Sequence, residues 1–270
     1  MLERREYRPI YFSGFDEGGY GQVNAYKKAD LHLHTNWTDG SLPPERVVDL
    51  AMLTGLSAIA ITDHNTHKSS DIAIDYAVQK NLSLEVIRGI EVSSRDGHVL
   101  ALNVEGEIEP HLPLEDTIQD IHRRKGLIIV AHPNLKRASS VPLKLLQEII
   151  DCNDQELHID GIEVFNASGA RMNRLDRVGL FFREEGQSLK DFVTANLLNP
   201  KLGALIGNSD AHTKRIGYGV SAYGHESVLE AIISRATTPM VAITSFSEDI
   251  LESVGMACSI IRSHLVGRVE

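Results

Sequence analysis

The sequence is poor in cysteine and lacks long apolar runs. Its 270 residues include only Cys152 and Cys258, and two cysteines so far apart in the chain do not make a disulfide framework. A membrane helix requires about 18 uninterrupted apolar residues, and no stretch of the chain reaches that length. The first residues also lack the apolar core of a signal peptide. We therefore expect a soluble protein of the reducing cytoplasm, with no membrane association.

Positive charge is also scarce. The chain has 27 Lys and Arg against 37 Asp and Glu, which gives a formal net charge of -10. Such a balance argues against broad electrostatic binding to nucleic acid or to an anionic membrane surface, so we expect no stable nucleic-acid complex. With 42% hydrophobic residues, the chain is long enough to bury one sizeable core, and a single domain is the default interpretation.

Short β-type runs alternate with helix-like segments along most of the chain. Residues 1–26 show no clear periodicity and predict an irregular N-terminal extension, which leaves residues 27–270 for one domain. The expected strands are 28–34, 58–64, 84–94, 98–104, 127–133, 161–166, 204–210 and 240–244. The expected helices are 44–54, 71–80, 114–125, 142–151, 172–185, 227–235 and 247–264. This alternation indicates parallel βα units in a closed or nearly closed α/β barrel.

Most of the expected strands end in a residue that can bind a metal ion. In a barrel of this kind the carboxyl ends of the strands share one face, so side chains that are far apart in the sequence can converge there. The residues at these ends are His32, His34, Asp63, His64, Glu91, His132, Asp210 and His212. We therefore expect a metal centre at the C-terminal ends of the strands.

Each of these residues also has a plainer interpretation. His32 and His34 lie two positions apart, which places both imidazoles on one face of a strand, yet strand histidines often serve only as hydrogen-bonding groups. Glu91 ends an apolar run, where a carboxylate is costly unless it is paired or coordinated. Its alternative partners are Arg88 and Arg95. The residues at the other strand ends could be helix caps or could only donate or accept hydrogen bonds beside a site, but their joint occurrence at successive strands favours the metal centre.

Five stretches of the sequence contain the expected ligands: DLHLHTNWTDG, AIAITDHN, RGIEVSS followed by DGHVLAL, IIVAHP and GNSDAH. They occur in order over residues 29–213, and together they resemble the motifs of the polymerase and histidinol phosphatase (PHP) superfamily. The resemblance implies a distorted, TIM-like (β/α)7 barrel. It also implies two or three divalent metal ions at the C-terminal ends of the strands.

The resemblance further implies nine metal ligands. The first ion would be held by His32, His34, Glu91 and Asp210. Glu91 would also bind a second ion, together with His98 and His132. The third ion would be held by Asp39, His64 and His212. The plainer interpretation of Asp39 is that it forms a turn with Gly40.

The chemistry of the expected ligands limits the choice of metal and points to further residues. Imidazole and carboxylate ligands without thiolate suit Zn, Mn or Fe. Asp63, which precedes His64, would either hold an imidazole in place, the role we favour, or transfer a proton. Arg171 is a candidate for clamping phosphate, unless it is an ordinary solvated charge. The same choice applies to three residues of the same stretch, Asn166, Ser168 and Arg174, and to Lys136 and Arg137 in the loop after His132.

The remaining six histidines have no motif support. We expect them at the surface, and only His67 lies near enough to the motifs to touch a substrate. They are His67, His111, His122, His158, His225 and His264.

The expected activity is metal-dependent hydrolysis of a phosphoester. The substrate would be a small anionic phosphorylated metabolite, a nucleotide or the end of a short oligonucleotide, and the chain has no room for a polymerase. One alternative is hydrolysis of a non-phosphate ester or amide, because a metal-activated water could attack either. Another is a non-catalytic metal-binding module. The sequence makes no prediction of the oligomeric state.

Overall fold

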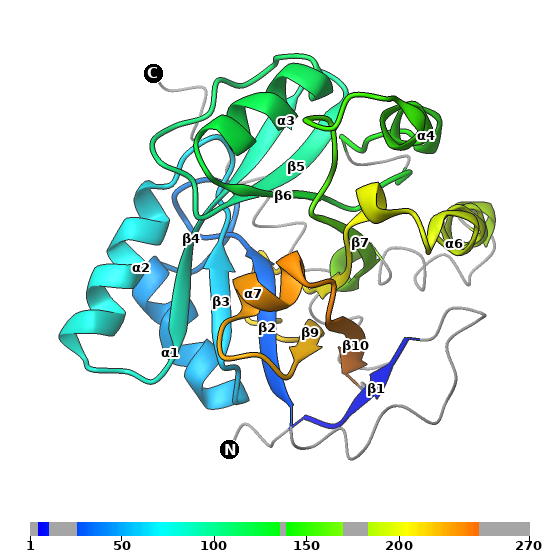
Figure 1. Ribbon diagram of the computed structural model, residues 1–270. Helices are drawn as coiled ribbons and strands as arrows, with labels where there is room; N and C mark the ends of the chain where they lie inside the picture. The colour runs from blue at the N-terminus through cyan, green and yellow to red at the C-terminus, as the bar shows by residue number, and fades with distance from the viewer. Residues whose placement is uncertain (1–4, 11–25, 136–138, 170–182, 243–270) are drawn as a thin grey trace.

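A computed structural model describes residues 5–10, 26–135, 139–169 and 183–242. Figure 1 shows a mixed α/β fold in which a curled sheet is surrounded by helices. The sheet has ten strands in the order β1-β10-β9-β2-β3-β4-β5-β6-β7-β8. Among the described ranges, none of the helices combines the length and hydropathy that a membrane span requires.

The strands run in both directions. Their bounds are β1 Tyr7–Pro9, β2 Lys27–Leu33, β3 Ala58–Ile61, β4 Glu85–Ser94, β5 Gly97–Leu102, β6 Leu127–Val130, β7 Gly161–Asn166, β8 Ala204–Asn208, β9 Gly219–Tyr223 and β10 Thr237–Ala242. The pairs β2–β3, β3–β4, β6–β7 and β7–β8 are parallel. The expectation of parallel units throughout is wrong for β5, which is antiparallel to both β4 and β6. Strand β9 was not expected, and it pairs antiparallel with β2 and β10.

The helices agree with the sequence pattern at several places. Their bounds are α1 Pro44–Thr54, α2 Lys68–Gln79, α3 Leu114–Arg123, α4 Leu143–Asp151, α6 Arg183–Asn196 and α7 Val228–Ile233, with a 3-10 turn at Pro200–Leu202. The predicted bounds of α1 are confirmed, because Pro44 begins the helix and Gly55 ends it in a left-handed conformation with φ 76°. Helix α2 begins three residues before its predicted start. Most of the predicted helix 172–185 and all of 247–264 lie outside the described residues.

Part of the predicted N-terminal extension is a strand. Tyr7–Pro9 forms β1 and pairs antiparallel with β10, with Tyr7 opposite Ala242. The Tyr7 hydroxyl also donates a hydrogen bond to the carbonyl oxygen of Gly217 at 3.0 Å. This segment therefore extends the edge of the sheet. The proposed division between residues 1–26 and 27–270 stays a prediction.

Strand β3 shows why the sheet strands are continuously apolar. Ala58 and Ala60 are buried on one face, in a cluster that also contains Leu31. Ile59 and Ile61 are buried in a second cluster that contains residues of helices α1 and α2. A strand covered on both faces has no polar side to alternate with.

The curl brings the last parallel strand, β8, back to β2 and β9. The side-chain oxygen of Asn208 accepts a hydrogen bond from the backbone N–H of Leu31 at 2.8 Å. The hydroxyl of Ser221 in β9 accepts from the N–H of Gly207 in β8 at 3.0 Å. A Cβ atom on Gly219 would lie 2.1 Å from the carbonyl oxygen of Asn208. The close approach of β8 and β9 therefore requires glycine at position 219.

We expect Gly219→Ala to destabilise the fold by about 1–3 kcal/mol, because the added methyl group forces the two strands apart. Urea unfolding of the variant and the wild type measures the difference. Gly224→Ala is the matched control, since its Cβ would meet nothing closer than Tyr26 at 3.6 Å. Equal stability of Gly219→Ala and the control would show that the strands do not close as described.

Asp160, directly before β7, connects the ends of several elements. Its Oδ2 atom lies 3.1 Å from Nε2 of His122 at the end of α3 and accepts a hydrogen bond from the N–H of Ile128 at 2.8 Å. Its Oδ1 atom lies 3.6 Å from Nε2 of His158. Burial alone would raise the pKa of Asp160, but the two histidines and the Ile128 amide outweigh it and lower the pKa to about 2. The pKa of His158 is raised, chiefly by its hydrogen bond to Asp160.

We expect Asp160→Asn to cost more stability at pH 5.5 than at pH 8.5. A histidine whose pKa is raised in the folded state contributes stability below its unfolded pKa, and this contribution is lost as the pH rises through the folded pKa. Denaturant unfolding of both proteins at the two pH values tests this. A cost that is the same at both values would exclude the charged His158–Asp160 pair.

Candidate metal centre

The structure brings together all nine residues that were expected to bind metal. They come from six strands or the loops directly after them. His32 lies in β2, His34 and Asp39 follow it, His64 follows β3, Glu91 and His98 lie in β4 and β5, His132 follows β6, and Asp210 and His212 follow β8. Five groups of three, each with its ligand atoms within 4.8 Å of one another, together contain all nine residues.

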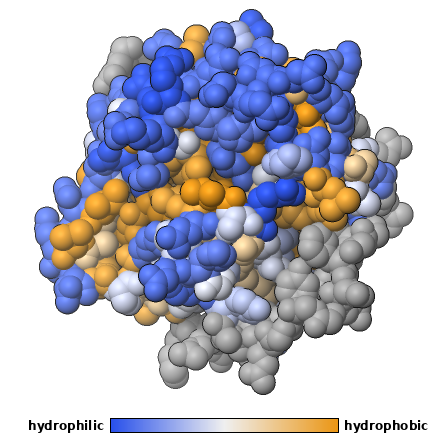
Figure 2. Space-filling view, in the orientation of Figure 1, coloured by the Kyte–Doolittle hydropathy of each residue, from blue (hydrophilic) through white to orange (hydrophobic). Residues whose placement is uncertain are grey.

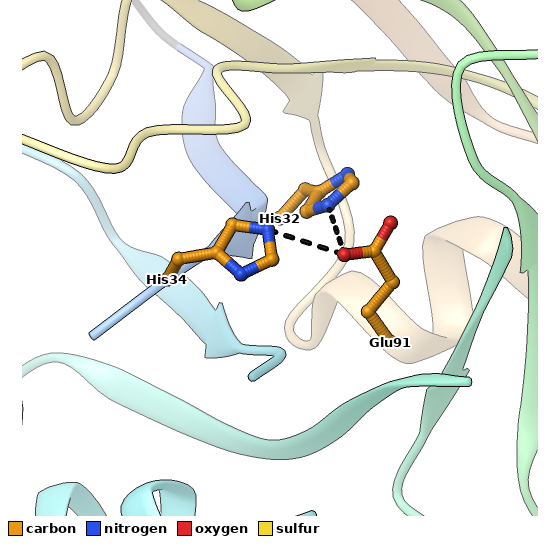
Figure 3. Close-up of side chains that lie close together, drawn as sticks. All are labelled: His32, His34 and Glu91. Carbon is orange, nitrogen blue, oxygen red and sulfur yellow. Dashed lines mark ion pairs between the residues drawn. The ribbon is translucent and has the colours of Figure 1, made fainter. Parts of the chain in front are cut away.

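Glu91 lies at the centre of this cluster. Its carboxylate is buried and faces five imidazoles, two of which are drawn in Figure 3. The nitrogen-to-oxygen distances are 3.4 Å to His32, 3.2 Å to His34, 3.2 Å to His64, 2.9 Å to His98 and 3.1 Å to His132.

The alternative pairing of Glu91 with an arginine is wrong. Arg88 instead contacts Asp71 at 2.7 Å, and Arg95 lies 3.7 Å from Asp96. A buried carboxylate whose neighbours are imidazoles and not an arginine fits the role of a metal ligand.

The β4–β5 hairpin explains the seven-residue spacing between Glu91 and His98. Glu91 lies opposite Leu100 in the antiparallel register. His98 is two residues from Leu100 and therefore projects from the same face of the sheet as Glu91. His98 thus enters the site from the start of an antiparallel strand, not from the carboxyl end of a parallel one.

The other two carboxylates contact the remaining side of the cluster. Asp210 Oδ1 lies 3.3 Å from His34 Nε2 and 3.5 Å from His212 Nδ1. Asp39 Oδ1 lies 3.2 Å from His34 Nδ1, and its Oδ2 lies 2.9 Å from His212 Nε2 and 3.5 Å from His64 Nε2. Asp39 lies in a turn, as the alternative interpretation of this residue predicted. Its carboxylate nevertheless also contacts three histidines.

Two of the expected ligands have an unusual backbone conformation. His132 has φ 28° and Asp210 has φ 53°. Residues other than glycine adopt positive φ at a cost, and such strain concentrates at functional sites. The turns after β6 and β8 hold these side chains toward the cluster despite that cost.

Several buried nitrogens are suited to a metal ion. Nε2 of His32, Nδ1 of His34 and Nδ1 of His64 are buried and lie 3.2–3.4 Å from carboxylate oxygens, but within the described residues none of the three makes a hydrogen bond of normal geometry. A buried polar atom without a partner costs free energy. A divalent ion would satisfy these lone pairs, so the residues present fit such an ion.

The carboxylates and imidazoles shift each other's pKa values. Burial by itself lowers the pKa of His32, but the charges of Asp210, Glu163 and Glu91 outweigh it and raise the pKa well above its usual value. For Glu91 the directions are reversed. Burial by itself raises the pKa of this carboxyl group, but the surrounding histidines outweigh burial and lower the pKa well below its usual value. All three carboxylates of the cluster have lowered pKa values. They are therefore ionised, as metal ligands must be.

Glu163 in β7 is a site residue that the sequence analysis missed. Its carboxylate is buried and lies 2.9 Å from Nδ1 of His32. It also accepts hydrogen bonds from the N–H of His132 at 2.7 Å and from the side-chain amide of Asn208 at 2.8 Å. A carboxylate of this kind fixes the ring orientation of a ligating histidine. The available signal was a glutamate inside the apolar strand GIEVFN, as at Glu91.

Asp63 lies beside the cluster but contacts no imidazole among the described residues. Its carboxylate accepts hydrogen bonds from the N–H of Thr35 at 2.8 Å and from the hydroxyl of Thr38 at 2.6 Å. The favoured expectation, that Asp63 holds an imidazole, is therefore wrong, and Glu163 has that role. Asp63 instead supports the turn after β2. Its role in proton transfer stays a prediction.

The expected phosphate clamps are only partly described. Arg171, Arg174, Lys136 and Arg137 lie outside the described residues. Asn166 donates a hydrogen bond to Asp210 Oδ2 at 3.1 Å. Ser168 lines a small pocket beside the cluster together with Asp210, His212 and Arg215. The buried Arg215 was not expected at the site, and its guanidinium lies 3.7 Å from the ring centre of Tyr218.

The other described histidines lie outside the cluster. His67, which could have touched substrate, lies 2.8 Å from Asp71 through Nδ1. His122 and His158 contact Asp160, and His225 contacts Ser234.

Known proteins are similar to this chain over parts of its length. A model of the PHP domain matches residues 30–155. An uncharacterized protein of Methanocaldococcus jannaschii is 32% identical over 151 residues, which are 52% of this chain and 82% of that protein. The chain belongs to the PHP domain family.

Two further similarities bear on activity and on fold. The 5'-3' exoribonuclease Rnm of Escherichia coli is 34% identical over 113 residues, which are 40% of this chain and 38% of that enzyme. A two-domain protein of Bacteroides vulgatus, containing a predicted PHP-like metal-dependent phosphoesterase, superposes with a TM-score of 0.58. That match has 20% identity and covers 88% of this chain and 69% of that chain. It supports the PHP fold.

We expect Glu163→Gln to lower the affinity for a divalent metal by about 10- to 100-fold. The neutral glutamine side chain cannot replace the charged carboxylate that faces the His32 ring and accepts a hydrogen bond from the backbone N–H of His132. Competition for Zn²⁺ with a chelating indicator measures the affinity, and thermal unfolding shows whether the variant is folded. Glu109→Gln, at an exposed glutamate, is the matched control. An unchanged affinity in a folded Glu163→Gln protein would contradict this role.

Proposed function

We propose that the protein is a metal-dependent phosphoesterase that acts on a small phosphorylated metabolite, a nucleotide or the end of an oligonucleotide. The convergence of six histidines with the carboxylates of Asp39, Glu91 and Asp210 carries this proposal. Such a set of ligands is much larger than the four that one structural zinc ion needs. It fits a site with several ions.

We propose two or three ions of Zn, Mn or Fe. The first would be held by His32, His34, Glu91 and Asp210, the second by Glu91, His98 and His132, and the third by Asp39, His64 and His212. The distances of 2.9–3.6 Å between these side chains support shared ions. The curled sheet would correspond to the distorted (β/α)7 barrel, with the ions at one end of its strands.

The proposed chemistry needs a nucleophile and a positively charged pocket. Bound divalent ions lower the pKa of a coordinated water toward neutrality and neutralise phosphoryl oxygens. The chain contributes three ionised carboxylates, Asp39, Glu91 and Asp210, and these cannot cancel the charge of three divalent ions. The pocket would therefore attract an anion despite the net charge of -10. Arg215, in the adjoining pocket, adds a cation that can bind phosphate.

The curated relatives support a phosphoester substrate. The E. coli protein, an exoribonuclease by name, matches over part of its length, so its substrate comes to this chain only as a proposal. Candidates for direct action on the substrate are Arg171 as a phosphate clamp and Asp63 in proton transfer. The scarcity of cysteine supports a cytoplasmic location for the reaction.

The experiment that tests this function compares three substrates. The protein, reconstituted with Mn²⁺ or Zn²⁺, is offered a phosphomonoester, a phosphodiester and a carboxylic ester. We expect metal-dependent phosphoester hydrolysis, with kcat at least about 100-fold lower in Asp210→Asn, because loss of one ligand carboxylate weakens the metal centre. Asp116→Asn, at an exposed position of α3, is the matched control.

Two outcomes would contradict the proposal. Faster hydrolysis of the carboxylic ester would assign the protein to a different class of hydrolase. Tight metal binding without turnover of any of the three substrates would indicate a binding module.

A further inference from the structure

Trp37 is an exposed aromatic residue in the turn between two of the candidate metal ligands. It is the single tryptophan of the chain, and its side chain is 48% exposed. The other exposed large hydrophobic residues of the described ranges are aliphatic, and none lies in this turn: Leu53, Val78, Leu198 and Ile233. Folding usually buries much of an indole because its apolar area is large. Its exposure at this position therefore suggests contact with a ligand.

The turn that carries Trp37 is firmly held. The buried carboxylate of Asp63 accepts hydrogen bonds from the N–H of Thr35 at 2.8 Å and the hydroxyl of Thr38 at 2.6 Å. The N–H of Trp37 itself donates to the hydroxyl of Thr35 at 3.2 Å. The N–H of Gly40 donates to the carbonyl oxygen of Thr35 at 2.8 Å. The backbone that positions the indole is therefore ordered before any ligand binds.

Close packing and a further bond hold the far end of the turn. A Cβ atom on Gly40 would lie 2.6 Å from the carbonyl oxygen of His34, so the two ends of the turn are in contact. The N–H of Ser41 donates to the carbonyl oxygen of His212 at 2.8 Å. The turn is thus joined to the loop after β8, which carries two other candidate ligands.

The position of Trp37 along the chain limits its distance from the cluster. It lies three residues after His34 and two before Asp39. Consecutive Cα atoms are about 3.8 Å apart, so the Cα atoms of Trp37 and Asp39 are separated by at most about 7.6 Å. An indole starting so close to the cluster can reach a group attached to a phosphate that is bound there.

We propose that Trp37 forms a stacking site for the base of a nucleotide, or of the terminal nucleotide of an oligonucleotide, whose phosphate lies at the metal centre. The inference rests on the proposed phosphoesterase function and specifies its substrate class. A planar indole stacks on every base without reading its sequence. The acidic chain disfavours a long nucleic-acid track, so one terminal base is the expected occupant.

Because Trp37 is the single tryptophan, its fluorescence reports on this site directly. Zn²⁺-loaded protein is titrated with the phosphonate analogue of AMP, which is not hydrolysed, and with inorganic phosphate. We expect the analogue to quench the fluorescence with saturation and phosphate to leave it nearly unchanged. Equal responses to both ligands, or none to the analogue, would overturn the proposal.

Kinetics supply the second readout. In Trp37→Leu, we expect the ratio of kcat/KM for AMP to kcat/KM for ribose 5-phosphate to fall about tenfold, mainly through KM, because only AMP carries a base. Trp37→Phe should retain most of the ratio, since it keeps an aromatic face. Leu198→Ala, at a 93% exposed residue, is the control and should not change the ratio. An unchanged ratio in Trp37→Leu would overturn the proposal.

The two proposals fail in different ways. If the wild type hydrolyses no phosphoester, the proposed function fails, and the fluorescence titration still decides whether Trp37 binds a base. If phosphoesters are hydrolysed and neither the fluorescence nor the ratio depends on the base, the phosphoesterase remains and the stacking site is excluded.

Discussion

The burial of the Glu91 carboxylate among histidines is the interaction on which the site depends. An ionised carboxylate in a protein interior is costly unless positive groups surround it. Here five imidazoles face it within 3.4 Å, and they come from β2, β5 and the loops after β2, β3 and β6. The curl of the sheet is what allows residues on so many strands to meet. Sheet shape and site chemistry are therefore linked.

A layer of carboxylates and amides supports these imidazoles from behind. Glu163 contacts His32 and the backbone of His132, and Asn208 connects Glu163 with the backbone of Leu31 in β2. The same Asn208 lies where β8 closes against β9 at Gly219. One set of hydrogen bonds thus fixes both the closure of the sheet and the orientation of a candidate ligand.

Polar residues around the mouth of the site divide into those that would bind metal and those that hold loops. Asp39 points at three histidines, whereas the neighbouring Asp63 is occupied by Thr35 and Thr38. The rigid turn between β2 and α1 therefore presents Trp37 to solvent beside the cluster. Arg215 lines a pocket that also contains Asp210, another carboxylate of the cluster. An aromatic and a cationic group near the candidate metal centre would suit the proposed ligand, which carries a base and a phosphate.

The sequence by itself determined the family, the bounds of α1 and the set of residues that could bind metal. Short-range patterns sufficed there, because a capped helix and an i, i+2 histidine pair are local features. Only the tertiary structure decided that β5 is antiparallel, that β9 completes the sheet, and that Glu163, not Asp63, holds an imidazole. These outcomes depend on strand register and on contacts such as that between His32 and Glu163, 131 residues apart. Local propensity carries no information about them, since which buried polar groups become partners is decided when the sheet closes.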